Sequence, residues 1–114
     1  MVKLRRYNSN YIMEIDNGVY KDYYGYKLYE LIENKIRPYG GGNYIYEIEG
    51  NKIRHYCGMP VLEFDGHFLR RYCGPIIYEV KDNVIKDYNS ANVYEIEGHL
   101  SKLELMGLLA ILFA

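Results

Sequence analysis

The feature that most constrains this chain is an acidic residue followed seven positions later by a basic one. In the stretch YEIEGNKIRHYCG, Glu47 precedes Arg54 by seven residues. Equivalent positions recur every 16 residues, with one step of 17 across the run Gly40–Gly42. The acidic positions are Glu14, Glu30, Glu47, Glu63, Glu79 and Glu95, and the basic ones are Arg5, Lys21, Arg37, Arg54, Arg70 and Lys86. Six copies of a 16-residue unit therefore run from about residue 3 to residue 98, and a repeat of this kind decides the fold.

Each unit has the pattern of a β-hairpin. Apolar and polar residues alternate, which is typical of strands. One turn of each unit has two residues, as in Asn17-Gly18 and Gly50-Asn51, and these residues tolerate the positive φ that tight hairpin loops need. A two-residue loop at Gly50-Asn51 places Glu47 directly opposite Arg54. The seven-residue offset is thus the reach of one hairpin.

The other turn has four residues, as in the segment CGMP at residues 57–60. Paired symmetrically about that loop, Tyr56 meets Val61, and Arg54 also faces Glu63. Continued around twelve strands, this predicts one row of charges that alternate in sign at every step. Opposed unlike charges contribute about 0.2–1 kcal/mol per pair, so we interpret the row as a lock on strand register.

The same register predicts two further rows. On the face of the charges, each tyrosine lies beside an apolar residue: Tyr7 by Ile12, Tyr23 by Leu28, Tyr39 near Ile45, Tyr56 by Val61, Tyr72 by Ile77 and Tyr88 by Val93. The opposite face is entirely apolar or aromatic and is the predicted core. It comprises Leu4, Ile15, Tyr20, Leu31, Ile36, Ile48, Ile53, Phe64, Leu69, Val80, Ile85 and Ile96.

The alternation stops after Gly98, and a helix is expected. Ser101 and Glu104 fit a capping box, and the segment LELMGLLAILFA that follows is apolar on almost every side. Such a helix must be buried all round, so Leu105, Leu108, Leu109, Ile111 and Leu112 are all expected in the core. A closed barrel of twelve strands has a radius of roughly 12 Å, enough for a helix and one layer of side chains. In that barrel Arg5 meets Glu95.

A two-sheet solenoid is the rival use of a 16-residue unit. It would stack like charges about 4.8 Å apart, which the alternating signs argue against. The sequence therefore predicts an all-β protein with one helix: a twelve-stranded antiparallel meander of six repeats, closed around a buried C-terminal helix. We expect one repeat domain over residues 1–114, with strands at about 2–97 and the helix at about 102–113.

This combination of twelve strands and a threaded apolar helix resembles the tubby-like architecture. The unit Y-x-G-x-x-I-Y-E-I-E-G-N-x-I-R also resembles uncharacterised bacterial tandem-repeat proteins. The tubby-like resemblance implies binding of lipid head groups.

Composition narrows the function further. Fourteen basic and 15 acidic residues are balanced, which argues against a nucleic-acid partner. The start MVKLRRYNSN lacks the apolar core of a secretory signal, and the run LMGLLAILFA is half as long as a membrane span, so a cytoplasmic location is expected. With two cysteines, no disulfide framework is expected.

No catalytic, cofactor or metal site is predicted. His55, Cys57 and Cys73 offer too few ligands for a metal site, and His67 and His99 fall in turns. The glutamates have basic neighbours that hold them ionised, unlike a general acid. No nucleophile elbow, phosphate loop or zinc-protease motif is present.

One group of residues is a candidate binding site. The inward positions next to the four-residue loops should form a polar, tyrosine-lined mouth facing the negative end of the helix. The candidate residues are Arg6, Asp22, Tyr29, Tyr46, His55, Arg71, Tyr78, Asp87 and Tyr94, with Pro38, Met13 and Leu62 between them. The residues of this mouth either satisfy one another or bind a ligand. The leading hypothesis is a non-catalytic binding or scaffold module for a protein or small molecule; lipid binding and an enzyme at the mouth are the alternatives.

Overall fold

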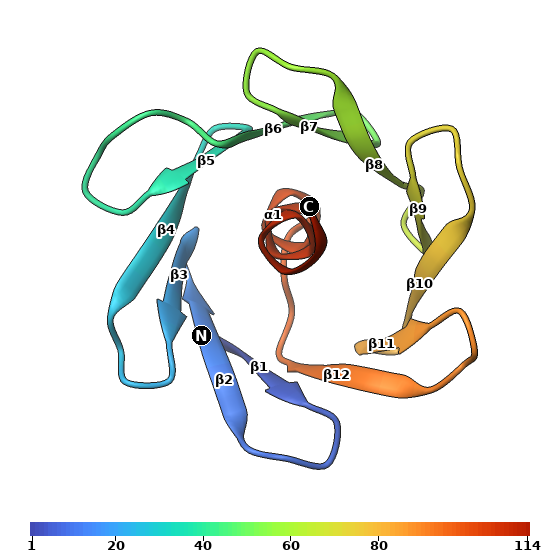
Figure 1. Ribbon diagram of the computed structural model, residues 1–114. Helices are drawn as coiled ribbons and strands as arrows, with labels where there is room; N and C mark the ends of the chain where they lie inside the picture. Colours follow the sequence, from blue (N-terminus) through green and yellow to red (C-terminus); the bar gives the residue numbers. More distant parts are fainter.

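The computed structural model describes residues 1–114 as a closed antiparallel barrel of twelve strands around one helix (Figure 1). Each strand pairs with the next along the chain, and β1 pairs with β12 to close the ring. The helix α1 covers Lys102–Phe113, as the sequence predicts. The strands are β1 Val2–Arg6, β2 Tyr11–Asp16, β3 Val19–Asp22, β4 Lys27–Ile32, β5 Lys35–Pro38, β6 Tyr46–Glu49, β7 Lys52–His55, β8 Pro60–Phe64, β9 Phe68–Arg71, β10 Ile76–Lys81, β11 Val84–Asp87 and β12 Asn92–Glu97.

The barrel is a flat disc, with extents of 37 × 35 × 17 Å. A 12-residue helix is about 18 Å long, so α1 spans the thickness of the disc. Figure 1 looks along this axis and shows α1 at the centre of the ring. The expected closure is confirmed, with Arg5 opposite Glu95 and Leu4 opposite Ile96.

The register within the two-residue hairpins is confirmed. Glu47 lies opposite Arg54, and Ile48 opposite Ile53. The other hairpins agree: Glu14 faces Lys21, Glu30 faces Arg37, Glu63 faces Arg70, and Glu79 faces Lys86. The seven-residue offset is therefore the span of one hairpin.

The predicted register across the longer connections is wrong. Arg54 faces Pro60, and Glu63 faces Lys52, two residues from the expected partner. The same shift occurs at every long connection, where the glutamates meet Lys3, Val19, Lys35, Phe68 and Val84. The single row of alternating charges is thus broken between hairpins.

Barrel geometry explains this correction. Strands in a closed barrel tilt, and tilt requires the register to stagger around the ring. Six shifts of two residues add up to a stagger of 12 residues around the ring. An unshifted row of charges would instead need strands parallel to the barrel axis. A shift of two keeps every side chain on its own face, so the division into core and surface survives.

A bulge accompanies the shift. Two residues of β10, Ile76 and Tyr78, match Arg70 and Leu69 on β9, so Ile77 is the extra residue. Ile12, Leu28, Val61 and Val93 hold the equivalent place in other hairpins.

Because of these bulges, the predicted row in which each tyrosine lies beside an apolar residue across the long connection is wrong. The N–H of Tyr72 donates to the carbonyl of Val61, across the two-residue hairpin, and Tyr72 does not pair with Ile77. Tyr7, Tyr39 and Tyr56 likewise donate to Val93, Leu28 and Ile45.

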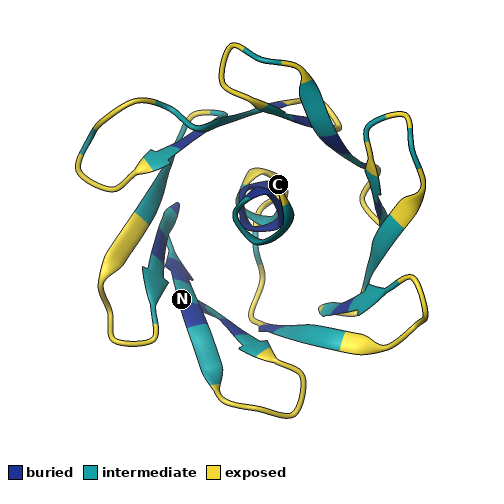
Figure 2. Ribbon diagram, viewed as in Figure 1, coloured by how far each residue is buried: buried dark blue, intermediate teal, exposed yellow.

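The core lies between the barrel wall and the helix, and Figure 2 marks buried positions on the strands and on α1. Ten of the twelve predicted wall residues are buried, and Leu31 and Val80 are half-buried against the same core. Met13 and Leu62 extend the core toward the mouth.

The helix is capped as predicted and then packed tightly. The Ser101 hydroxyl accepts from the Glu104 N–H at 3.1 Å, and the Ser101 N–H donates back to the Glu104 carboxylate. Gly107 lies against Tyr20, where a Cβ would come within 2.4 Å of the phenol oxygen. The residue type at this position is therefore set by the barrel wall.

Not every apolar residue of the helix is enclosed. Leu108 and Leu109 are fully buried, but Leu105, Ile111 and Leu112 are half-buried, contrary to expectation. They lie toward the ends of α1, where a 17 Å disc opens to solvent on both sides. No helix of the structure has the length and apolar character needed to cross a membrane.

Candidate functional site at the mouth of the barrel

The two ends of the barrel differ, and the helix distinguishes them. Near its start, the Glu104 carboxylate accepts from the Gly18 N–H, in a two-residue turn. Near its end, the Ala114 carbonyl accepts from the Tyr46 hydroxyl at 3.2 Å. The second end carries the six longer connections, residues 7–10, 23–26, 39–45, 56–59, 72–75 and 88–91. We call these the long connections, and we call the end they surround the mouth.

An aromatic cluster covers the end of the helix. The Phe113 ring stacks on Tyr78, with centroids 3.9 Å apart and planes 23° apart, and meets Tyr94 edge-on at 6.1 Å. The guanidinium of Arg6 lies 5.8 Å from the centre of the Tyr94 ring. Three predicted mouth residues are thus brought together, partly through Phe113, which the sequence did not single out for this site.

A second group of aromatic rings, Tyr46 and His55, lies across the mouth from this cluster. The rings of Tyr46 and His55 stack 5.6 Å apart on paired strands. Burial, together with the nearby Tyr29 phenol, raises the pKa of Tyr46. Tyr46 therefore stays protonated and can donate to the last turn of α1.

The two mouth aspartates have structural roles. One Asp87 oxygen accepts from the N–H groups of Asn89 and Ala91, at 2.9 and 3.0 Å. Asp22 binds the N–H groups of Tyr24 and Tyr26 in the same way. Each aspartate fixes the fold of its own connection by an Asx-type turn.

This turn changes where the neighbouring tyrosine goes. Tyr23 and Tyr88, which follow the aspartates, lack the N–H bond to the adjacent hairpin that Tyr7, Tyr39 and Tyr56 make. Their exposed fractions are 61 % and 75 %, against 38–43 % for those three. An aspartate at the mouth thus releases a tyrosine ring to solvent.

The one pocket of the structure opens at this mouth, with a volume of about 440 Å³. Its lining includes three predicted site residues and four that the sequence did not indicate. The lining is Arg71, Tyr78 and Asp87, with Ile77, Tyr88, Leu112 and Phe113. Ile77 is a bulge residue and Tyr88 a released tyrosine, so both reach the pocket through the local irregularities just described.

Arg71 carries the free positive charge of this pocket. None of the ion pairs within 4 Å involves its guanidinium, and none joins it to Asp87. The two charged side chains therefore face one space without neutralising each other directly.

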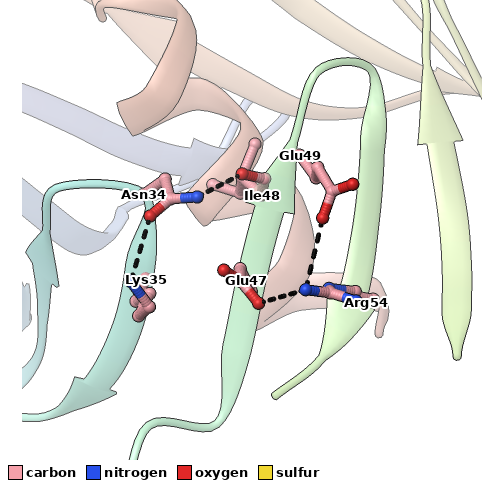
Figure 3. A network of polar contacts seen from close by, with 6 residues as sticks. All are labelled: Asn34, Lys35, Glu47, Ile48, Glu49 and Arg54. Carbon is pink, nitrogen blue, oxygen red and sulfur yellow. Dashed lines mark hydrogen bonds and ion pairs between the residues drawn. The ribbon is translucent and has the colours of Figure 1, made fainter. Parts of the chain in front are cut away.

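The charges on the outer wall form a separate, structural system. Arg54 contacts Glu47 at 2.7 Å and Glu49 at 3.2 Å (Figure 3). The hydrogen bond that Arg54 donates to the Glu47 carboxylate raises the pKa of Arg54. Three of the six opposed pairs form ion pairs: Glu47–Arg54 and Glu30–Arg37 within hairpins, and Glu95–Arg5 where β12 meets β1. Glu79 instead contacts His67. These carboxylates contact basic side chains of the outer wall and lie outside the mouth pocket.

The cysteines do not assemble into a centre. Cys57 and Cys73 are both free and exposed, each with positive φ in its long connection. No group of three histidine, cysteine or acidic side chains is placed to hold a metal ion.

Comparison of the chain with protein-family models, with curated proteins and with solved structures finds no match. The structure thus defines a class, a twelve-stranded antiparallel barrel with one C-terminal helix.

Proposed function

We propose that this protein is a non-catalytic binding module that takes its ligand at the mouth. The single observation that carries the proposal is the distribution of exposed apolar and aromatic side chains. All the large exposed ones except Met1 and Leu103 lie in the long connections or beside them: Tyr7, Tyr23, Tyr24, Tyr26, Leu28, Tyr39, Tyr56, Met59, Ile76 and Tyr88. Apolar surface gathered on one end of a molecule is typical of an interaction site.

The chemistry of this end suits recognition. Tyrosine offers a large contact area with few rotatable bonds and a polar tip, and asparagine, serine and glycine of the same connections supply hydrogen bonds. The mouth carboxylates bind backbone amides, which favours a structural role for them over acid–base chemistry.

The test is a binding screen of the full chain by amide-resolved NMR. The panel contains free amino acids, monosaccharides, aromatic acids, inorganic phosphate and short peptides. We expect at least one compound to shift resonances of the long connections and of the last turn of α1, and Tyr88→Ser to weaken that binding. Leu103→Ser, at an exposed apolar site near the start of the helix, is the control and should bind normally. The proposal fails if every compound leaves the mouth resonances in place.

Lipid binding, which the tubby-like resemblance implies, is the second candidate. Two exposed side chains, Met59 and Ile76, give the mouth an apolar rim that could enter a membrane surface. Flotation with phosphatidylcholine vesicles, with and without phosphoinositide, tests it. Co-flotation that Met59→Ser abolishes would support this candidate, and protein remaining at the bottom of the gradient would contradict it.

A further inference from the structure

We infer that the mouth pocket binds a small zwitterion with an aromatic body, the chemistry of a free aromatic amino acid. This inference rests on the proposed function and adds the ligand class. The observation behind it is the pairing of opposite, separate charges around one apolar pocket.

The two charges come from strands that flank β10. Arg71 lies on β9 opposite Leu62, and Asp87 lies on β11 opposite Tyr78. Leu62 is buried and Tyr78 contacts the helix, so both charged residues share the inward face. Their backbones are two strand spacings apart, about 9.6 Å, a gap that a ligand with two charged groups can bridge.

Each charged group retains capacity for a ligand. Arg71 has no ion-pair partner in the protein. The loop amides that bind Asp87 use only its Oδ1 atom, which leaves Oδ2 to accept a further donor. A ligand carboxylate would pair with Arg71, and a ligand ammonium with Asp87.

The helix adds to the negative side of the pocket. Leu112 and Phe113 line it, so the C-terminal end of α1, the negative end of the helix dipole, faces the same space. A ligand with only a negative charge would meet Asp87 and this helix end. A ligand with only a positive charge would meet Arg71. The electrostatics therefore favour a molecule that carries both.

The apolar walls suit a flat hydrophobic group. Tyr88 is 75 % exposed, and the stacked pair of Tyr78 and Phe113 presents ring surface at the pocket. Aromatic rings pair by offset or edge-on contact, which a phenyl or indole side chain can make. A volume of about 440 Å³ falls in the range of small-molecule sites.

The experiment is a titration of the full chain with L-phenylalanine, followed by amide-resolved NMR. N-acetyl-L-phenylalanine lacks the ammonium, and L-phenylalanine amide lacks the carboxylate. We expect L-phenylalanine to shift the resonances of Ile77, Tyr88 and Phe113. Each comparator should bind at least about tenfold more weakly, because a charge-assisted contact is lost.

Matched variants test the named charges. Asp87→Asn retains an oxygen that can hold the turn but removes the charge, so it should weaken L-phenylalanine binding about tenfold. Arg71→Met should do the same. Asp22→Asn makes the identical change in a connection that does not line the pocket, and it should leave binding unchanged.

The possible failures are distinguishable. If all three probes bind equally, or if L-phenylalanine fails while other compounds of the panel bind at the mouth, the zwitterion is wrong and the binding module stands. If Asp22→Asn weakens binding as much as Asp87→Asn, the assignment of Asp87 is wrong. If no compound reaches the mouth, the proposed function falls as well.

Discussion

The hydroxyl of Tyr20 donates a hydrogen bond of 2.7 Å to the main-chain carbonyl of Glu104. Tyr20 is fully buried in β3, and Glu104 lies in the first turn of α1. Burial, with the nearby Glu104 carboxylate, raises the pKa of Tyr20 far above its usual range. The phenol therefore stays a donor at any ordinary pH, and it fixes the height of the helix within the barrel.

Replacing Tyr20 by phenylalanine should destabilise the protein by about 0.5–1.5 kcal/mol, because one buried hydrogen bond is lost. Urea unfolding followed by circular dichroism measures the change. Tyr29→Phe is the control, since this half-buried phenol makes no side-chain hydrogen bond in the protein. An equal loss from both variants would contradict the role given to Tyr20.

Gly107→Ala should also destabilise, by about 1–3 kcal/mol from overpacking. The new methyl group would lie 2.4 Å from the Tyr20 oxygen and 2.8 Å from Ile36 Cδ1, and this clash outweighs the higher helix propensity of alanine. The Tyr20→Phe background removes the closer atom, so the double variant should lose less than the sum of the singles. Strict additivity would show that the two residues do not meet.

The staggered register predicts which charge pairs are coupled. Glu30 and Arg37 oppose each other, with Arg37 Nη2 3.5 Å from Glu30 Oε1. Charge reversal at both positions should give a coupling free energy of about 0.2–1 kcal/mol in a double-mutant cycle. Arg54 and Glu63, neighbours only in an unstaggered barrel, should couple less. Stronger coupling between Arg54 and Glu63 than between Glu30 and Arg37 would contradict the staggered register.

Glu104 should contribute a pH-dependent part of the stability. Burial alone would raise the pKa of Glu104, but hydrogen bonds from Ser101 and the Gly18 N–H outweigh it and lower that pKa below 4.5. The stabilisation is thus present above about pH 4.5 and disappears as the pH falls through the folded-state pKa. Glu104→Gln should cost about 0.3–1 kcal/mol at pH 6.5, and this cost should shrink as the pH falls below about 4.5. Unfolding free energies at several pH values check this, and a cost that does not change with pH would refute it.

Leu108→Asp should cost at least about 3 kcal/mol, because it places an unpaired charge among apolar side chains around the whole helix. Leu103→Asp, at an exposed position of the same helix, should change stability by less than about 0.5 kcal/mol. Circular dichroism melts compare the two. A cooperative, stable Leu108→Asp protein would mean that the helix can leave the barrel.

Local pattern alone predicted much of this fold. The two-residue turns fix the pairing of residues such as Glu47 and Arg54, and the all-round apolar character of residues 105–113 requires an enclosing wall. The stagger escaped prediction because it belongs to the closed ring: nothing within one repeat says that Glu63 meets Lys52. The strand tilt that a closed barrel requires accounts for it.

The residues that lie around the mouth were likewise predictable only where strict alternation holds. The alternation of faces predicts Arg71, Tyr78 and Asp87 at the mouth, and all three line the pocket there. It assigned Ile77 and Tyr88 to the outer face, because a bulge and an Asx-type turn are departures from alternation. Both departures leave a signal in the sequence. The extra apolar residue of each repeat indicates the bulge, and the aspartate before the tyrosine indicates the Asx-type turn.

The closure of β1 on β12 has a consequence for how such a chain can evolve. Open arrays of repeats gain or lose copies easily, since each copy contacts only its neighbours. Here the lumen must match α1, and removing one hairpin would shrink the radius by about a sixth, roughly 2 Å, and expel the helix. Copy number is therefore fixed by the diameter of a single helix, and variation is confined to the loops between copies.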